Sequence, residues 1–482
     1  MSARPARKYT CVWIILSAAI VFTALALVPW HDDIRVRRAT GIVLIALILW
    51  ITEVMPLGVT GLLIPIGATF AGVLTWPEAL AAWSDPILFL FLGAFLLARG
   101  LEKHGAFDFL IHARWTQRFR GGHGAALALV VLLVAGVLSS VQSNTAVAAM
   151  MLPAVVALAR TVRSPTIVLL ALSYGATFGG MATPVGTPPN FIGYAAMKKL
   201  DTGVSFLSWM RVGVPVWMGT TLLTWGLLSL TKRLGVTLVT TGAPPAPADA
   251  PAVAPDGTQS GHARSAAARR WAVAAFAITV AIWLGTGLVV SLTQADDPVQ
   301  KWVLRYLPES LAPLLAAGLL FLVRVYPARE PVLDRRDLLA LDWDTLYLIA
   351  GGLCLGKMLQ SSGAAAALAA AASHVQISPL LAMLALGGAT VLLSELTSNT
   401  ATAALMVPIA ASLAPAVGLA PMQTIWLVAL CASLGFALPV STPPNAIVYG
   451  TRLVPLKAMV PLGIAVDIMS LIWVVLCMRW LA

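Results

Sequence analysis

Apolar residues dominate nearly the whole chain, and polar or basic residues interrupt them at intervals of about one membrane thickness. A helix rises about 1.5 Å per residue and the hydrocarbon core is about 30 Å thick, so a span needs roughly 20 residues. The pattern predicts eleven full transmembrane helices, which begin near residues 11, 37, 57, 86, 166, 211, 271, 308, 344, 421 and 457. The sequence therefore predicts an all-α integral membrane protein.

Two further apolar regions, 122–160 and 379–419, have a polar tip between two short arms. In the first region the tip is 139–145, and each arm reaches only about 21 Å at the helical rise. Such a hairpin is expected to enter the membrane and return to the same side. Unpaired backbone at its tip is tolerated only where protein or a water-filled cavity surrounds it.

The composition excludes a soluble protein. Hydrophobic residues make up 59% and charged residues 11% of the 482 positions, and the mean hydropathy is +0.88. Soluble proteins average about 45–50% apolar and about 25% charged residues. The four cysteines lie in apolar runs without metal-ligand spacing, so we expect them to be small buried hydrophobes.

The net charge of +11 comes mainly from basic residues in short loops, which indicates membrane topology rather than nucleic-acid binding. With the N-terminus inside, the predicted cytoplasmic loops carry 20 Lys and Arg residues and the outer loops carry 9. Arg35, Arg37 and Arg38 run against this bias. We therefore expect a multi-pass plasma-membrane protein, in the inner membrane of a bacterial cell, with a cytoplasmic N-terminus.

Residues 233–270 are rich in Ala, Pro and Gly and cannot bury a core. We expect a disordered cytoplasmic linker here, which divides the chain into a first half, 1–232, and a second half, 271–482. Residues 106–120 mix apolar and basic side chains at helical spacing. This segment fits either an interfacial helix along the membrane surface or an ordinary basic loop.

Residues 139–190 and 394–445 are two copies of one sequence. They align without a gap at an offset of 255, and 21 of the 52 positions are identical. Both copies begin with a Ser-Asn-Thr tip and end with Thr-Pro-Pro-Asn. An identity of this extent indicates an internal duplication.

Five predicted spans separate the two tips, and an odd number inverts the second copy relative to the first. Inverted repeats with interrupted helices, and a site near the membrane midplane, are typical of secondary transporters. The chain has only four asparagines, and all occupy matched positions of the two copies: Asn144, Asn190, Asn399 and Asn445. Because a buried amide without partners is costly, they must be satisfied by one another, by backbone or by a ligand.

The motifs Pro-Val-Gly-Thr-Pro-Pro-Asn at 184–190 and Pro-Val-Ser-Thr-Pro-Pro-Asn at 439–445 predict breaks within two helices, 166–198 and 421–452. An unwound segment frees carbonyl oxygens for a hard cation, and the half-helix that follows has an N-terminus that favours an anion. One such motif is also common as a packing kink. Two copies in register favour an ion-binding role.

No Lys or Arg lies near a tip or a break in the sequence, since Arg99 and Lys357 fall toward the ends of their predicted spans. An anion bound at mid-membrane must then be neutralised by helix N-termini and co-bound cations, which indicates cation-coupled symport. Glu395 either faces water or caps the short helix, or else it carries a proton. Asp467 has no evident partner.

Enzymatic alternatives find little support in the motifs. The six histidines lack metal-site spacing, no Walker motif is present, and no serine is paired with a base at membrane depth. We expect no catalytic site, no cofactor other than coupling ions, and no nucleic-acid partner. A membrane-embedded enzyme or sensor is the remote alternative.

The two Ser-Asn-Thr tips, the two Thr-Pro-Pro-Asn breaks and the segment 433–448 (SLGFALPVSTPPNAIV) closely resemble the divalent anion/sodium symporter family. This family comprises the sodium:dicarboxylate and sodium:sulfate symporters of solute carrier family 13. The resemblance covers essentially residues 10–480. It implies a homodimer whose scaffold domain holds a moving transport domain, which works as an elevator.

The resemblance also implies two sodium sites that flank one substrate site. Carried over to this chain, the first sodium site resembles Ser139, Ser143, Asn144 and the backbone at Gly186, and the second resembles Ser394, Ser398, Asn399 and the backbone near Ser441. The substrate carboxylates would meet Ser143, Asn144, Thr145, Thr187, Ser398, Asn399, Thr400 and Thr442. Both copies are intact, which favours sodium coupling over the sodium-independent exchange that also occurs in the family.

We therefore expect a secondary transporter that couples sodium to the import of a divalent anion, foremost a C4-dicarboxylate such as succinate, malate or fumarate. Sulfate or another oxyanion is an alternative substrate, and dicarboxylate exchange without sodium is an alternative mechanism. Hydroxyl and amide donors suit carboxylate and sulfate alike, so the residues leave the substrate open.

Overall fold

The computed structural model describes residues 28–106, 124–233, 266–373 and 377–481, apart from Pro29, Thr202 and the pairs 295–296 and 327–328. The span expected near residue 11, nearly all of the segment 106–120 and most of the expected linker lie outside the described residues. Residue 233 and residues 266–270, at the two ends of the expected linker, belong to helices.

The first half of the chain is entirely helical in its described elements. They are α2 (Ile34–Thr52), α3 (Leu57–Phe70), α4 (Trp76–Leu80), the 3-10 helix η1 (Ala81–Ser84), α5 (Pro86–Lys103), α7 (Ala125–Ser139), α8 (Asn144–Ala159), α9 (Pro165–Gly180), α10 (Pro188–Leu200) and α11 (Phe206–Arg233).

The second half adds one short antiparallel hairpin to its helices. The elements are α12 (Ala266–Leu292), α13 (Pro298–Tyr306), α14 (Leu311–Leu322), β1 (Arg324–Val325), β2 (Glu330–Pro331), α15 (Arg335–Leu339), α16 (Trp343–Ser361), α17 (Ala364–Ser373), α18 (Pro379–Leu396), α19 (Asn399–Leu413), the 3-10 helix η3 (Ala414–Val417), α20 (Pro421–Cys431), α21 (Pro443–Gly450) and α22 (Leu456–Leu481).

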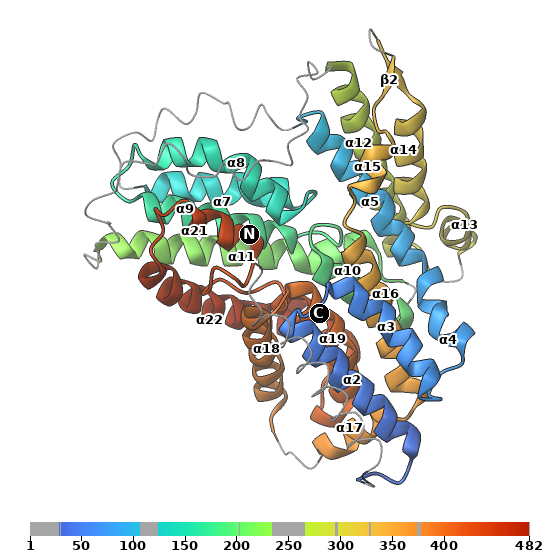
Figure 1. Cartoon of the computed structure of the whole chain (residues 1–482). Helices are drawn as coiled ribbons and strands as arrows, with labels where there is room; N and C mark the ends of the chain where they lie inside the picture. The colour runs from blue at the N-terminus through green and yellow to red at the C-terminus, as the bar shows by residue number, and fades with distance from the viewer. Residues whose placement is uncertain are drawn as a thin grey trace, which may run out of the picture.

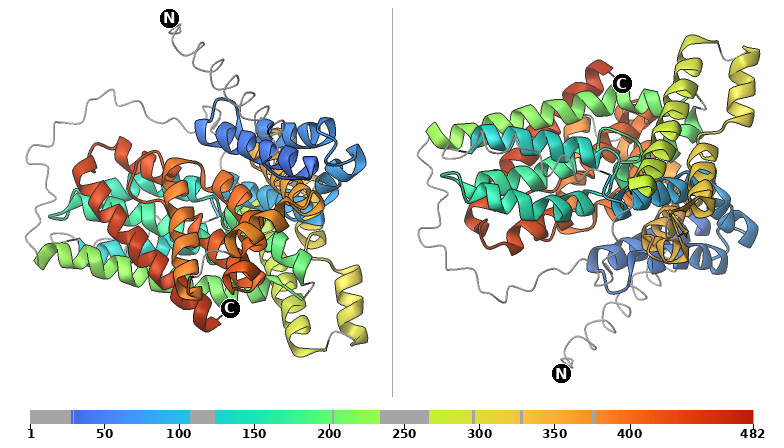
Figure 2. Two further views of the ribbon diagram at one scale, coloured as in Figure 1. Left: turned by 90° about the horizontal axis from the view of Figure 1, so that it is seen from below. Right: turned by 90° about the horizontal axis from the view of Figure 1, so that it is seen from above.

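The two copies of the repeat mix in space although they lie far apart in the sequence. Helices α7, α8 and α9 gather with α11, α21 and α22 on one side of the molecule, as Figure 1 shows, and α9 packs on α21. Helices α5, α12, α14 and α15 form the opposite side, and α10, α16 and α19 lie between the two. The views of Figure 2 show the same division.

Helix lengths identify a multi-pass membrane protein. Six segments of the described residues are long and apolar enough to cross a membrane: Trp76–Lys103, Phe206–Leu230, Ala266–Leu292, Pro379–Leu396, Asn399–Val417 and Leu456–Trp480. Helices α13 and α14 meet at 42° and would add a seventh as one bent span. The expected eleven spans stay a prediction, because α3, α9 and α20 have only 14, 16 and 11 residues.

The segments expected to form hairpins each contain two helices. In the first, α7 and α8 have 15 and 16 residues, close to the short arms expected from the sequence. In the second, both arms are long enough by themselves to cross a membrane. In the second hairpin the first arm is longer than the sequence pattern suggested, because α18 continues through Ser394 and Glu395 to Leu396.

Glycines allow the first hairpin to pack closely on α9. A Cβ placed on Gly179 would lie 2.1 Å from the Gly136 carbonyl oxygen, and one placed on Gly175 would lie 2.7 Å from the Leu132 carbonyl oxygen. Residues four apart share one helix face, so Gly175 and Gly179 form a small-residue stripe against α7. This contact brings the first tip close to the break that follows α9.

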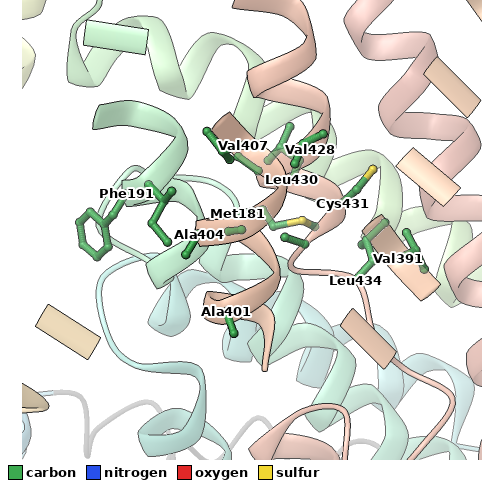
Figure 3. Close-up of a cluster of buried hydrophobic side chains, with 14 of the residues drawn as sticks. Met181, Phe191, Val391, Ala401, Ala404, Val407, Val428, Leu430, Cys431 and Leu434 are labelled. Carbon is green, nitrogen blue, oxygen red and sulfur yellow. The ribbon is translucent and has the colours of Figure 1, made fainter. Parts of the chain in front are cut away.

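A buried apolar cluster supports the second tip from behind. Val407 of α19 lies beside Val428 of α20, whereas Ala404 lies on the side of Phe191 of α10 (Figure 3). Ala404 also packs against Gly352 of α16, where an added Cβ would lie 2.9 Å from the Ala404 Cβ, so small residues let α19 approach its neighbours closely. The N-terminus of α19 is thereby held at the place where the second tip ends.

Candidate functional site

One cavity of about 1070 Å³ is bordered by both tips and both helix breaks. Ten of the twelve sequence-predicted site residues line it: Ser143, Asn144, Thr145, Gly186, Thr187, Ser398, Asn399, Thr400, Ser441 and Thr442. Residues of the two copies, about 255 positions apart in the sequence, thus share one space. The remaining two, Ser139 and Ser394, lie behind the wall and are fully buried.

Four helices of the repeat begin at this cavity, and α16 begins there too, with Asp342 as its N-cap residue. Helices α8, α10, α19 and α21 have Ser143, Thr187, Ser398 and Thr442 as their N-cap residues, and all four residues line the cavity. The side chains of Ser143, Thr187 and Ser398 make no helix-capping hydrogen bond. Backbone N–H groups at a helix N-terminus carry partial positive charge, so four converging N-termini favour an anion.

Each tip is braced by the same hydrogen bond. Ser139 donates its hydroxyl to the Oδ1 of Asn144 at 2.6 Å, and Ser394 donates to the Oδ1 of Asn399 at 2.8 Å. The bond fixes the amide so that its Nδ2 is turned away from the serine. Each asparagine therefore has one satisfied end and one end available at the cavity.

The other two asparagines hold the helix breaks in shape. Asn190 is fully buried and donates from Nδ2 to the carbonyl oxygens of Gly180 at 2.8 Å and Thr183 at 2.7 Å. Asn445 makes the same two bonds at the matching positions 435 and 438, at 3.0 and 2.9 Å. These bonds satisfy carbonyl groups that the unwound segments leave without helical partners.

The two copies differ in the hydrogen bonding of the amide oxygens, the Oδ1 atoms of Asn190 and Asn445. The Oδ1 of Asn445 accepts a hydrogen bond from Ser173 of α9 at 2.5 Å. The position 255 residues after Ser173 is Val428, which has no hydroxyl, and the Oδ1 of Asn190 has no partner among the described residues. The break of the second copy is therefore held more completely than that of the first.

The two predicted cation positions also differ. In the first copy Gly186 approaches so closely that a Cβ on it would lie 2.3 Å from the Gly180 carbonyl oxygen. In the second copy Ser441 occupies this position, and its hydroxyl donates to the Glu395 carboxylate. The sequence difference between Gly186 and Ser441 thus corresponds to different packing at the two breaks.

Glu395 caps the second break from inside the protein. It is buried, and its carboxylate accepts from the backbone N–H groups of Ala437 at 2.7 Å and Leu438 at 3.2 Å. The expectation that Glu395 faces water is wrong. Asp467 of α22, which had no evident partner in the sequence, contacts Glu395 and accepts from the Phe436 N–H at 3.5 Å.

The cavity wall opposite the tips carries charge. Arg99 of α5 is the only Lys or Arg among the lining residues of the described chain, and Glu53, Glu102, Asp342 and Asp344 also border the cavity. Asp342 and Asp344 are engaged by backbone N–H groups. The sequence places Arg99 away from the tips, but the fold brings it to the same cavity.

Sequence reasoning missed several cavity residues that carry polar chemistry, namely Gln142, Arg99 and the four carboxylates that border the cavity with it. Arg99 could not be found, because its position depends on how α5 packs beside the repeat. Gln142 left a signal, since it stands within the polar tip directly before Ser143.

Comparison with known proteins places this geometry in a family. The family model described as citrate transporter (CitMHS) matches residues 47–432, which is most of the chain. The chain belongs to the citrate transporter family. This family is one of transporters, in agreement with the expectation that the chain is not an enzyme.

Curated relatives support the resemblance seen in the motifs. A protein of Haemophilus influenzae described as an uncharacterized transporter is 29% identical over 474 residues, covering 95% of this chain and 94% of the relative. The sodium-dependent dicarboxylate transporter SdcS of Staphylococcus saprophyticus is 28% identical, covering 90% of this chain and 83% of the relative. SdcS of Staphylococcus aureus strain MRSA252 is 27% identical, with the same coverage.

A solved structure shares the fold. The crystal structure of the Alcanivorax borkumensis YdaH transporter, reported to have an unusual topology, matches with a TM-score of 0.53 and 15% sequence identity. The match covers 99% of this chain and 98% of that chain. At this identity the likeness concerns the fold alone.

Proposed function

We propose that the protein is a secondary transporter that imports a divalent anion together with sodium, foremost a C4-dicarboxylate. One observation carries the proposal, namely that four helix N-termini, two from each copy of the repeat, begin at one cavity. Each copy offers a set of N–H, hydroxyl and amide donors suited to one anionic group. Two such sets suit a substrate with an anionic group at each end.

Sodium supplies the charge that this part of the site lacks. The tip and break residues at the cavity are uncharged, and Arg99 on the opposite wall is paired with Asp337 at 3.3 Å. Two negative charges taken out of water without compensation are strongly unfavourable. We assign one sodium ion to each copy, held by oxygens of Ser139, Ser143, Asn144 and Gly186 and of Ser394, Ser398, Asn399 and Ser441.

The names of the relatives agree with this assignment. SdcS proteins are described as sodium-dependent dicarboxylate transporters, and they match about nine-tenths of this chain. We further propose that the two copies are inverted in the bilayer and that the repeat moves as an elevator against α5, α12 and α14. We also propose that the chain works as a homodimer in a bacterial inner membrane, with its N-terminus in the cytoplasm. Inverted repeats with interrupted helices support such alternating access.

Uptake into proteoliposomes tests the proposal. Labelled succinate should accumulate when an inward sodium gradient is applied, and it should not accumulate when choline replaces sodium. Equal uptake in choline would refute symport in favour of exchange. Uptake of sulfate but not of succinate would keep the coupling and change the substrate.

A further inference from the structure

Gln142 borders the cavity and carries a buried, unsatisfied amide. It lies in the first tip directly before Ser143 and lines the cavity. It exposes 4% of its surface, and neither its Nε2 nor its Oε1 has a hydrogen-bond partner among the described residues. Because a buried amide without partners is strongly unfavourable, its position beside the substrate site points to a ligand group that completes it.

In the second tip, the residue that matches Gln142 has hydrogen-bond partners within the protein. The residue 255 positions after Gln142 is Thr397. The Thr397 hydroxyl donates to the Leu393 carbonyl oxygen at 2.9 Å and pairs with the Thr402 hydroxyl at 2.8 Å. The second tip thus satisfies its own polar side chain, whereas the first leaves an amide unsatisfied. The two tips share their Ser-Asn-Thr residues, so this difference makes the two ends of the cavity unequal.

The hydrogen-bonding capacity of the Gln142 amide indicates which chemical group of a ligand could satisfy it. Nε2 donates hydrogen bonds and Oε1 accepts them. A carboxylate only accepts, so it satisfies Nε2 and leaves Oε1 unpaired. A hydroxyl accepts from Nε2 and donates to Oε1, and it therefore satisfies both atoms. Three rotatable bonds allow the Gln142 amide to turn toward a bound molecule.

Building on the proposed function, we propose that Gln142 is a specificity-determining residue that recognises a hydroxyl group next to one carboxylate of the substrate. The preferred substrate class is then a hydroxydicarboxylate rather than an unsubstituted dicarboxylate. The hydroxyl-bearing end lies at the first tip, and the plain carboxylate lies at the second.

Malate and succinate differ by one hydroxyl and provide the test. Sodium-driven uptake of each should be measured as kcat and KM for the wild type, for Gln142→Leu and for Gln142→Thr, which carries the residue of the second tip. The wild type should prefer malate in kcat/KM by about threefold to tenfold, the ratio that one neutral hydrogen bond supports. Both variants should bring the ratio to about one through a higher KM for malate, while the KM for succinate changes by less than about twofold.

Thr397→Val is the matched control, since it removes the polar group at the corresponding position of the second tip. It should leave the malate-to-succinate ratio unchanged. A wild type without preference for malate, or Gln142 variants that retain it, would overturn the inference.

A second measurement on the wild type alone does not depend on how the variants fold. In the presence of sodium, malate should raise the melting temperature of the purified protein more than an equal concentration of succinate. Equal stabilisation by the two would overturn the inference. Sodium-dependent uptake of neither compound would overturn the proposed function, whereas uptake of both at equal kcat/KM would overturn only the role of Gln142.

Discussion

At the scale of single residues, the four asparagines divide into two pairs with different tasks. Asn144 and Asn399 have a braced Oδ1 and line the cavity, so their amide nitrogens face the space where a ligand would bind. Asn190 and Asn445 are fully buried, and their amide nitrogens donate hydrogen bonds to backbone carbonyls of the breaks. The sequence shows only that all four asparagines occupy matching positions of the two copies. The fold shows that one pair lines the cavity and the other pair holds the helix breaks.

Substitution separates these two tasks. Asn144→Ala and Asn399→Ala should each abolish transport while membrane insertion is retained, and each should lower the melting temperature somewhat, because the buried Ser139 or Ser394 hydroxyl loses an acceptor. Asn190→Ala should lower the free energy of unfolding by about 1–3 kcal/mol, because the Gly180 carbonyl loses its side-chain partner and the Thr183 carbonyl keeps only a 3.4 Å bond from the Gly186 N–H. Uptake and thermal unfolding measured on the same preparations decide between these outcomes, and full transport by both Asn144→Ala and Asn399→Ala would contradict the site assignment.

The unequal support of the two breaks gives a second prediction. Ser173→Ala removes the donor to the Asn445 Oδ1 and should destabilise the protein by about 1–3 kcal/mol. Ser361→Ala removes an exposed hydroxyl that bonds only to the Lys357 and Met358 carbonyls of its own helix, so it is the control and should cost less. Denaturant unfolding of the purified variants measures both, and an equal loss of stability would argue against a structural role for the Ser173 bond.

At the scale of elements, the interruptions of the repeat follow from chemistry that is visible in the sequence. Proline has no N–H and blocks helix continuation, and α10 and α21 begin at Pro188 and Pro443 of the two motifs. The length of the arms was harder to predict, since Ser394 and Glu395 continue α18 instead of ending it. A polar residue interrupts the hydrophobic pattern of the sequence. The helix itself ends only where the backbone N–H and C=O groups lose their helical hydrogen-bond partners.

Contacts between distant elements were beyond prediction for a physical reason. Arg99 reaches the cavity because α5 packs on α14 and lies beside the repeat, and no local pattern encodes that arrangement. Glu395 finds its partners more than 40 residues away, at Ala437 and Leu438. Periodicity reports which face of a helix is apolar, but it does not report which other helix covers that face.

The close packing of α7 on α9 can be tested at Gly179. Gly179→Ala should destabilise the protein by about 1–3 kcal/mol and reduce transport, because its Cβ would lie 2.1 Å from a backbone oxygen of Gly136 and must push the helices apart. Gly226→Ala in α11 is the control, since a Cβ there meets nothing within 4 Å. Thermal unfolding should show a loss for the first variant only, and a neutral Gly179→Ala would refute the close helix contact.

At the scale of the whole molecule, a partly buried ion pair ties the site to the opposite side of the protein. Glu309, in the turn between α13 and α14, accepts from Lys198 at 2.6 Å and from Tyr194 at 2.6 Å, both on α10. It also accepts from the backbone N–H of Phe206 at 3.0 Å, at the start of α11. The half-helix that begins at the first break is thus anchored to the helices that the elevator proposal treats as static.

Breaking this link should affect stability more than an exposed pair does. Glu309→Gln should lower the free energy of unfolding by roughly 2 kcal/mol, less than the about 3–5 kcal/mol of a fully buried pair, because Lys198 is partly exposed. Lys199→Gln is the control, since its ion pair with Asp85 spans 3.3 Å and the lysine is half exposed. Chemical unfolding that showed equal effects for the two variants would contradict an anchoring role for Glu309.

The central claim is that both copies of the repeat form one site in which bound cations neutralise a doubly charged anion. Calorimetric titration of the purified protein with succinate, with and without sodium, tests it most directly. The account predicts that succinate binds in sodium, fails to bind in choline, and fails to bind to either Asn144→Ala or Asn399→Ala even in sodium. Undiminished succinate binding without sodium, or in a variant that lacks one of the two tip asparagines, would contradict it.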